Sequence, residues 1–267
     1  MISAIAHPTD FSTEGNVAFA HALRLALANR CRLDLLHVRS PRDGDHWSEF
    51  PHVRETLVAW GLLAPGASTD DIAAKTGVTV RKVDIREKDA VHGLNQFLLG
   101  HRPDLLVMGT HGRDGLNRWL AGSVSESIAQ RTHLPTLFIG PEARSFVDCK
   151  TGALGLDTIL VAVTHEPSPD RALGTLERLT EGLAPTHHFV HVGDAEPKLI
   201  TSTGEPIIVK RLQGPVVGAI LSEAEKVDAN LIAMPTAGHH GFLDVLRGST
   251  TEQVLRQSPC PVLALPA

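Results

Sequence analysis

The sequence predicts an α/β fold of two tandem, doubly wound, mostly parallel five-stranded sheets. Three observations support this prediction. Short apolar and β-branched runs alternate with segments of helical periodicity, the same series restarts after residue 156, and a glycine loop follows an apolar strand in both halves. Each crossover between parallel strands needs a helix to return the chain, so the alternation indicates sheets that helices cover on both faces.

The first half alternates strands and helices along its whole length. Apolar runs predict strands over 2–7, 33–38, 78–85, 105–109 and 136–140. Helical spacing predicts helices over 19–27, 53–63, 70–75, 90–99 and 123–131. Val91, Leu94 and Leu98 recur on one face of the fourth helix, which we expect to pack on the sheet. Ser123 is a suitable cap for the last helix.

The second half repeats the first at two different offsets. Ile159–Val163 matches the first strand at an offset of 154 residues, and Asn230–Met234 matches the fourth strand at 126. The second half is therefore 28 residues shorter between its second and third strands, where the first half has a helical excursion at about 41–75. We expect one domain over 1–141, a linker over 142–156 and a second, shortened domain over 157–267.

Composition and charge argue against several classes of protein. The net charge of −5 and the isoelectric point near 6.3, without any basic block, argue against a nucleic-acid partner. No run of about 18 apolar residues predicts a membrane span, and the start lacks a basic segment followed by an apolar one, so we expect a cytoplasmic protein. Three cysteines without C-x-x-C spacing predict neither a disulfide framework nor a cysteine zinc site.

Three segments of the first half should meet at one edge of its sheet, because the carboxyl ends of parallel strands lie together there. They are Pro8-Thr9-Asp10, His37-Val38 and Gly109-Thr110-His111-Gly112. Asp10 can accept hydrogen bonds from a sugar hydroxyl or a base amino group, and the glycine loop with the helix start after it can bind phosphates. The pattern predicts a mononucleotide site. Two plainer interpretations stay open: Asp10 caps the following helix, and the glycines form a turn.

These residues resemble the signature of the universal stress protein family in its tandem two-domain form. The resemblance is carried by Pro8-Thr9-Asp10-Phe11-Ser12, by Leu36-His37-Val38 and by the pattern G-x2-G-x9-G-[ST] at Gly109, Gly112, Gly122 and Ser123. It implies the Rossmann-like fold of the adenine nucleotide alpha hydrolases. It also implies binding of ATP, accompanied by Mg²⁺, or of ADP or AMP in its place.

The resemblance further implies a set of nucleotide-binding residues, of which the first border adenine and ribose and the later ones border the phosphates. They are Pro8, Thr9, Asp10, Val38, Met108, Gly109, His111, Gly112, Arg113, Gly122, Ser123, Val124 and Ser125. Arg113 either contacts a phosphate or is solvated at the loop tip. The sequence contains no evident carboxylate cage for Mg²⁺.

The second half departs from this signature at two positions. Thr164 stands at the position of Asp10, and Pro235 replaces Gly109. Proline lacks the N–H group and fixes φ near −65°, so we expect this half to bind ATP weakly or not at all. The same half carries His165, His191, His239 and His240 near the predicted edge. These histidines are candidate ligands for Zn²⁺ or another divalent metal, or they line a vestigial pocket.

These features favour an ATP-binding stress-response regulator or sensor with little turnover. The glycine loop has no Walker lysine, and no nucleophile–base pair is evident, so we assign no catalytic residue. One alternative is an enzyme, either a slow ATPase or a metal-assisted hydrolase that uses the histidines. Another alternative is an interaction module that has lost its nucleotide.

The resemblance also implies how the halves associate. The last strands, Thr136–Gly140 and Val262–Leu265, should pair within one chain as a pseudo-dimer, while pairing of two chains stays open. The excursion at 41–76 carries Trp47, Phe50 and Trp60. These aromatic residues either anchor a partner or pack against their own domain.

Overall fold

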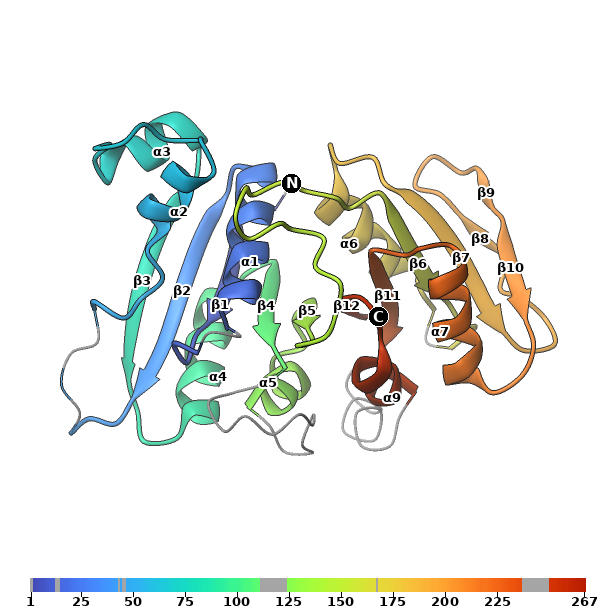
Figure 1. The fold of residues 1–267 in the computed structure, drawn as a ribbon. Helices are drawn as coiled ribbons and strands as arrows, with labels where there is room; N and C mark the ends of the chain where they lie inside the picture. The colour runs from blue at the N-terminus through green and yellow to red at the C-terminus, as the bar shows by residue number, and fades with distance from the viewer. Residues whose placement is uncertain are drawn as a thin grey trace. The chain divides into compact units, whose positions relative to one another are not determined.

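The computed structural model describes residues 2–12, 15–42, 44, 47–110, 124–166, 168–236 and 250–267. By its internal contacts the chain divides into two compact units, coloured from blue to green and from green to red in Figure 1. Unit 1 consists of Met1–Leu134 and Val147–Leu154, and unit 2 of Pro135–Phe146 and Gly155–Ala267. Each unit contains a mostly parallel sheet with helices, so the predicted α/β class is confirmed.

Unit 1 contains a parallel sheet in the order β4-β1-β2-β3. Its strands are β1 (Ala4–Pro8), β2 (Arg32–Arg39), β3 (Thr79–Arg86) and β4 (Leu105–Gly109). Helix α1 (Gly15–Asn29) packs on β1 and β4, whereas α4 (Ala90–His101) and α5 (Val124–Thr132) pack together. The core beneath α4 and α5 is formed by Ala6, Leu36, Leu94, Leu98, Leu106, Met108 and Ile128.

Unit 2 repeats this arrangement in the order β10-β7-β6-β11-β12-β5. Its strands are β6 (Thr158–Ala162), β7 (Thr186–Val192), β10 (Val209–Leu212), β11 (Leu231–Thr236), β12 (Val262–Pro266) and β5 (Thr136–Ile139). Its helices are α6 (Asp170–Thr180), α7 (Val216–Lys226) and α9 (Thr250–Gln257). Strand β5 runs antiparallel to β12, with Thr136 opposite Ala264 and Phe138 opposite Val262. This confirms the predicted pairing of the two last strands.

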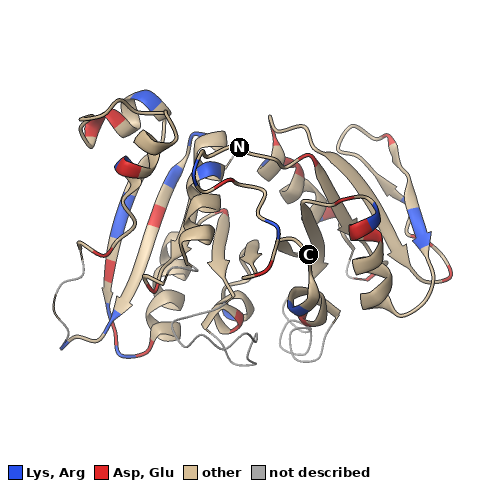
Figure 2. Cartoon of the chain, viewed as in Figure 1, with Lys and Arg blue, Asp and Glu red and all other residues tan. Residues whose placement is uncertain are grey.

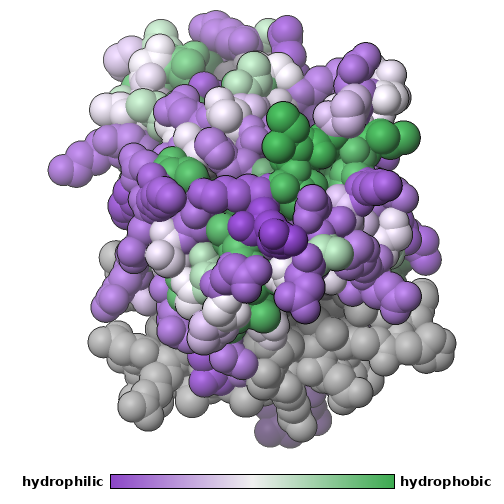
Figure 3. All heavy atoms as spheres, turned by 90° about the vertical axis from the view of Figure 1, so that its right-hand side faces the viewer, coloured by the Kyte–Doolittle hydropathy of each residue, from purple (hydrophilic) through white to green (hydrophobic). Residues whose placement is uncertain are grey.

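The units differ most between their second and third strands. Unit 1 has α2 (Val53–Ala59) and α3 (Asp70–Thr76) there, whereas unit 2 has a short hairpin of β8 (Leu199–Ile200) and β9 (Pro206–Ile207). Two isoleucines, Ile200 in β8 and Ile208 directly after β9, are 64% and 90% exposed. Figure 3 views that side of the molecule and shows apolar surface among mostly polar side chains.

The aromatic residues of the excursion serve mainly to attach it to unit 1. Phe50 and Trp60 are buried, so of the two alternatives ordinary packing is confirmed for both. Trp60 Nε1 donates to the carbonyl oxygen of Cys149 at 3.0 Å, which ties the excursion to the segment Val147–Leu154. Trp47 is 49% exposed, so of the three aromatic residues it is the one that remains accessible.

Charged residues of both signs are interspersed in both units (Figure 2). Two carboxylates of unit 1 are buried in ion pairs between β2 and β3. Asp34 accepts from Arg32 Nε and from Arg81 Nη2, the latter at 2.8 Å. Arg39 Nε donates to Asp84 Oδ2 at 2.7 Å, with both side chains almost fully buried. Within the described part of the chain, no helix is long and apolar enough to span a membrane.

Candidate functional site

The first strand end of unit 1 is held against β2 by backbone and side-chain hydrogen bonds. Thr9 N donates to the carbonyl oxygen of Leu36 at 2.8 Å. The carbonyl oxygen of Thr9 lies 2.8 Å from His37 Nδ1, so that nitrogen carries a proton and donates. Because β1 pairs with β2 on one side and with β4 on the other, the ends of these three strands, at Pro8, Arg39 and Gly109, lie at one edge. Pro8, Thr9 and Asp10 are half-buried there.

Asp10 organises the turn that leads from β1 into α1. Its Oδ1 accepts hydrogen bonds from Ser12 N at 3.0 Å and from Ser12 Oγ at 2.6 Å. Ser12 Oγ in turn accepts from Gly15 N, at the first residue of α1, at 3.1 Å. Ser12, rather than Asp10, therefore accepts from the first N–H group of α1, and Asp10 supports that contact from one step behind. These hydrogen bonds also hold the Asp10 carboxylate in the turn at the edge.

An aromatic cluster stands beside this turn. Phe11 adopts a positive φ of 64°, and its ring stacks on His37 with 4.0 Å between ring centroids. Phe50 of the excursion packs edge-on against Phe11 at 5.3 Å. Trp47 stacks on Phe50 at 5.5 Å. The excursion therefore forms one wall beside Asp10.

The end of β4 is attached to the start of α5. Ser125 Oγ donates to the carbonyl oxygen of Gly109 at 2.8 Å, and Ser125 is nearly buried. Met108 is buried in the core, and Val38 packs against that same core. Val124 is 40% exposed. Of the predicted nucleotide residues, His111, Gly112, Arg113, Gly122 and Ser123 lie outside the described residues.

His7 is a buried polar residue behind this edge that sequence reasoning did not single out. Its Nδ1 lies 3.0 Å from the carbonyl oxygen of Val107, and its Nε2 has no partner within the described part of the chain. Burial lowers the pKa of His7 from 6.5 to about 4, against the opposing effects of the Val107 carbonyl and the Asp10 charge. The sequence feature that could have identified His7 is the presence of a histidine within an otherwise apolar strand.

Unit 2 has the same backbone arrangement at the corresponding edge. Val163 N donates to the carbonyl oxygen of Val190 at 2.8 Å, and His191 Nδ1 lies 2.9 Å from the carbonyl oxygen of Val163. His165 takes the position of Phe11, and its ring lies edge-on to His191 with 5.3 Å between centroids. The duplication therefore extends to individual hydrogen bonds.

The predicted metal ligands of unit 2 are only partly described. His165 Nε2 lies 2.8 Å from the carbonyl oxygen of Ala195, so His165 and His191 each direct one ring nitrogen at a backbone carbonyl. His239 and His240 lie outside the described residues. Among the described residues no group of three His, Cys, Asp or Glu could hold a metal ion. The metal site therefore stays a hypothesis that depends on the other two histidines.

The end of β11 differs from the end of β4. Strand β11 includes Pro235 and Thr236, which pair with Leu265 and Pro266 of β12, whereas β4 ends at Gly109. Thr236 is buried, and its hydroxyl has no hydrogen-bond partner within the described part of the chain. Strand β11 thus ends one aligned position later than β4, and Pro235 offers no N–H to a ligand.

Comparison with known proteins assigns the family. The sequence profile of the universal stress protein family matches residues 1–140 and 201–266. A universal stress protein of Mycolicibacterium smegmatis is 24% identical over a match 286 residues long. The match covers 96% of this chain and 94% of the relative. A universal stress protein of Methanocaldococcus jannaschii is 37% identical over 68 residues, which cover 26% of this chain and 40% of the relative.

Solved structures share the fold over the whole chain. A universal stress protein from Archaeoglobus fulgidus has a TM-score of 0.65 at 22% identity, covering 98% of this chain and 96% of that chain. A protein of unknown function from Pseudomonas aeruginosa has a TM-score of 0.64 at 16% identity, covering 99% of this chain and 92% of that chain. Since the family profile matches well over half of its residues, this chain belongs to the universal stress protein family.

Proposed function

We propose that this chain binds ATP at the sheet edge of unit 1 and acts as a stress-response regulator or sensor with little turnover. The observation that carries the proposal is the convergence of three strand ends with the Asp10 carboxylate held in place by its own turn. The glycine pattern that begins at Gly109 follows directly from this edge. ADP and AMP share the groups that the edge would recognise.

Each part of the edge suits one part of the nucleotide. Asp10 would accept hydrogen bonds from ribose hydroxyls or the adenine amino group, and Val38 would offer an apolar contact to the base. Backbone N–H groups of the glycine pattern, with Ser123 and Ser125, would bind the phosphates. Arg113 would add a charge-assisted contact.

Mg²⁺ would be held mainly by the nucleotide itself. Among the described residues there is no cluster of three potential ligands, and Asp10 Oδ1 already accepts two hydrogen bonds. Mg²⁺ commonly keeps several waters and binds through substrate phosphates, so this edge does not require a carboxylate cage. The ion would neutralise phosphate charge.

We propose that unit 2 binds ATP weakly or not at all. Thr164 replaces the Asp10 carboxylate, and Pro235 replaces a glycine with a residue that has no N–H group. The pairing of β5 with β12 supports an intramolecular pseudo-dimer of the two halves; sedimentation of the full chain would test whether two chains also associate.

The direct test is native mass spectrometry of the gently extracted full chain, followed by ATP titration. We expect one adenine nucleotide per chain, lost in Gly112→Val because a bulky side chain would block the approach of phosphate. The matched control, Gly238→Val at the corresponding position of unit 2, should retain the nucleotide. Retention in Gly112→Val with loss in Gly238→Val would overturn the proposal.

Turnover distinguishes the regulator from the enzymatic alternative. We expect no more than trace phosphate release over many equivalents of ATP, because the edge offers no evident nucleophile–base pair. Sustained release that Gly112→Val abolishes would instead support a slow ATPase. Elemental analysis of protein purified without a histidine tag would test the metal-assisted alternative.

A further inference from the structure

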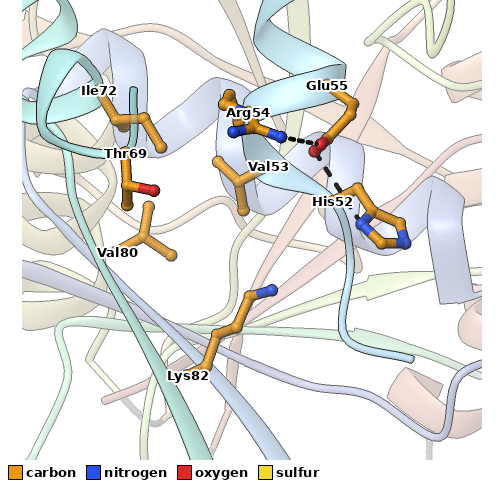
Figure 4. A pocket seen from close by; sticks show the side chains of 8 residues that line it. All are labelled: His52, Val53, Arg54, Glu55, Thr69, Ile72, Val80 and Lys82. Atoms are coloured by element: carbon orange, nitrogen blue, oxygen red, sulfur yellow. Dashed lines mark hydrogen bonds and ion pairs between the residues drawn. The ribbon is translucent and has the colours of Figure 1, made fainter. Parts of the chain in front are cut away.

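The excursion of unit 1 forms a pocket away from the Asp10 edge, on the side of β3 that α2 and α3 cover. The pocket has a volume of about 300 Å³. Figure 4 shows the side chains of Val53, Ile72 and Val80 along one side of this space. They come from α2, α3 and β3 respectively. The apolar side of the pocket is therefore built by residues that are far apart in the sequence.

Two polar groups of this pocket are not committed to protein partners. Lys82 extends from β3 into the space in Figure 4 and makes no ion pair within the described part of the chain. Its ammonium lies 5.7 Å from the centroid of the Phe50 ring. Thr69 stands before α3, and its side chain makes no capping hydrogen bond. An ammonium and a hydroxyl are thus available to a ligand.

The remaining charges leave the pocket positive. Glu55 Oε1 accepts from Arg54 Nη2 at 2.7 Å, and Glu55 Oε2 lies 4.0 Å from His52 Nδ1. Arg54 therefore offsets the Glu55 carboxylate, while Lys82 is left as a net positive charge. Desolvation by burial lowers the pKa of Lys82, and the charge of Glu55 opposes this effect, as a bound anion would.

We propose that this pocket binds a small organic anion with an aliphatic body. Lys82 and Thr69 would bind the anionic head, and Val53, Ile72 and Val80 would contact the body. Carboxylate and phosphate heads share this chemistry, and the experiment separates them. Unit 2 has only a short hairpin at this point of its fold, so the site would occur once per chain. The proposal does not rest on nucleotide binding, because none of these residues belongs to the edge at Asp10.

The test is calorimetric titration of the full chain with hexanoate and, separately, with hexyl phosphate. We expect saturable binding in roughly the millimolar range, as befits so small a ligand. Hexylammonium, which has the same body and the opposite charge, should not bind. The tighter of the two anions identifies the head group. Failure of both anions to bind, or equal binding of hexylammonium, would overturn the proposal.

Matched lysine variants locate the site. Lys82→Met should weaken binding of the anion about tenfold or more, because it removes a charged hydrogen-bond donor and keeps the apolar stem. Lys210→Met is the control, since Lys210 lies on the corresponding strand of unit 2 and is paired with Glu223. Thr69→Val should have a smaller effect in the same direction. Binding that Lys82→Met leaves unchanged would contradict the assignment, whatever the result for ATP.

Discussion

The two sheet edges have the same backbone and different side chains. In both units the first strand end donates to the second strand at 2.8 Å, and a histidine contacts its carbonyl oxygen at 2.8 Å or 2.9 Å. On this shared frame, unit 1 carries Asp10 and Gly109, whereas unit 2 carries Thr164 and Pro235. The comparison teaches that the histidine and the backbone pairing belong to the shared fold, while the carboxylate and the glycine are what distinguish the proposed ATP site of unit 1.

The units also differ in how their edges are supported. Unit 1 joins the ends of β2 and β3 through the buried pair of Arg39 and Asp84, and the residue at the corresponding position to Arg39 in unit 2 is Gly193. His7 and His21 are buried in unit 1, where unit 2 has Val161 and Thr175. Unit 1 therefore depends more heavily on buried ionisable groups.

The largest expected effect of a single substitution comes from breaking the buried ion pair of unit 1. Asp84→Ala should lower the free energy of unfolding of unit 1 by about 3–5 kcal/mol, because it leaves the Arg39 charge buried without this carboxylate. Chemical denaturation, followed by the tryptophans of that unit, measures the loss. The double variant Arg39→Met, Asp84→Leu should cost less than Asp84→Ala alone. A loss below about 1 kcal/mol for Asp84→Ala would refute the inference that unit 1 depends on buried ionisable groups.

The next effect is acid sensitivity, because low pH should lower the folding stability of unit 1 more than that of unit 2. Burial lowers the pKa of both His7 and His21 from 6.5 to about 4, so between these values the unfolded chain binds protons that the folded chain does not. Stability is therefore fully present above pH 6.5 and falls as the pH drops towards 4. Each histidine accounts for about 3 kcal/mol over this window.

Hydrogen exchange at pH 7 and pH 5 measures this difference unit by unit. Unit 2 contains one described histidine with a lowered pKa, the half-buried His187, so its stability should fall less. His7→Val introduces the residue that unit 2 has at this position and should remove part of the acid sensitivity of unit 1. Equal acid sensitivity of the two units would contradict the assignment to His7 and His21.

His37 of unit 1 and His191 of unit 2 occupy equivalent positions, and replacing them should have a smaller and more specific effect, on ATP affinity. His37→Ala should weaken ATP binding by about 1 kcal/mol, roughly fivefold, because His37 positions the Thr9 carbonyl and stacks on Phe11. His191→Ala removes the same hydrogen bond from unit 2 and should leave ATP affinity unchanged. Both are compared by titration of the full chain. If both variants weaken ATP binding equally, the two edges are not functionally distinct.

The fold and its duplication could be predicted from sequence because they depend on local patterns. Offsets of 154 and 126 residues located the excursion of unit 1, and the last strands pair as the family resemblance implied. Lys82 and Thr69 could not be predicted as neighbours of one pocket, because β3, α2 and α3 come together only in the folded unit. The burial of Phe50 was equally hidden, since an aromatic residue in a polar stretch suits both an interface and a core.

The sequence left the role of Asp10 open between cap and ligand. The structure shows Oδ1 accepting hydrogen bonds from Ser12, whose hydroxyl accepts from the first N–H group of α1. A local cap can be recognised from Asp and Ser spacing, whereas ligand binding depends on β2 and β4 as well. His7 escaped notice because its burial depends on the sheet around it.

The most direct test of the central claim is ATP titration of the full chain with Asp10→Asn and Thr164→Ala as a matched pair. Asp10→Asn keeps an oxygen that accepts from Ser12, so the turn is retained while the carboxylate charge is lost. The account predicts one site per chain, weakened about tenfold or more by Asp10→Asn and unaffected by Thr164→Ala. Two equal sites, or weakening by Thr164→Ala alone, would contradict it.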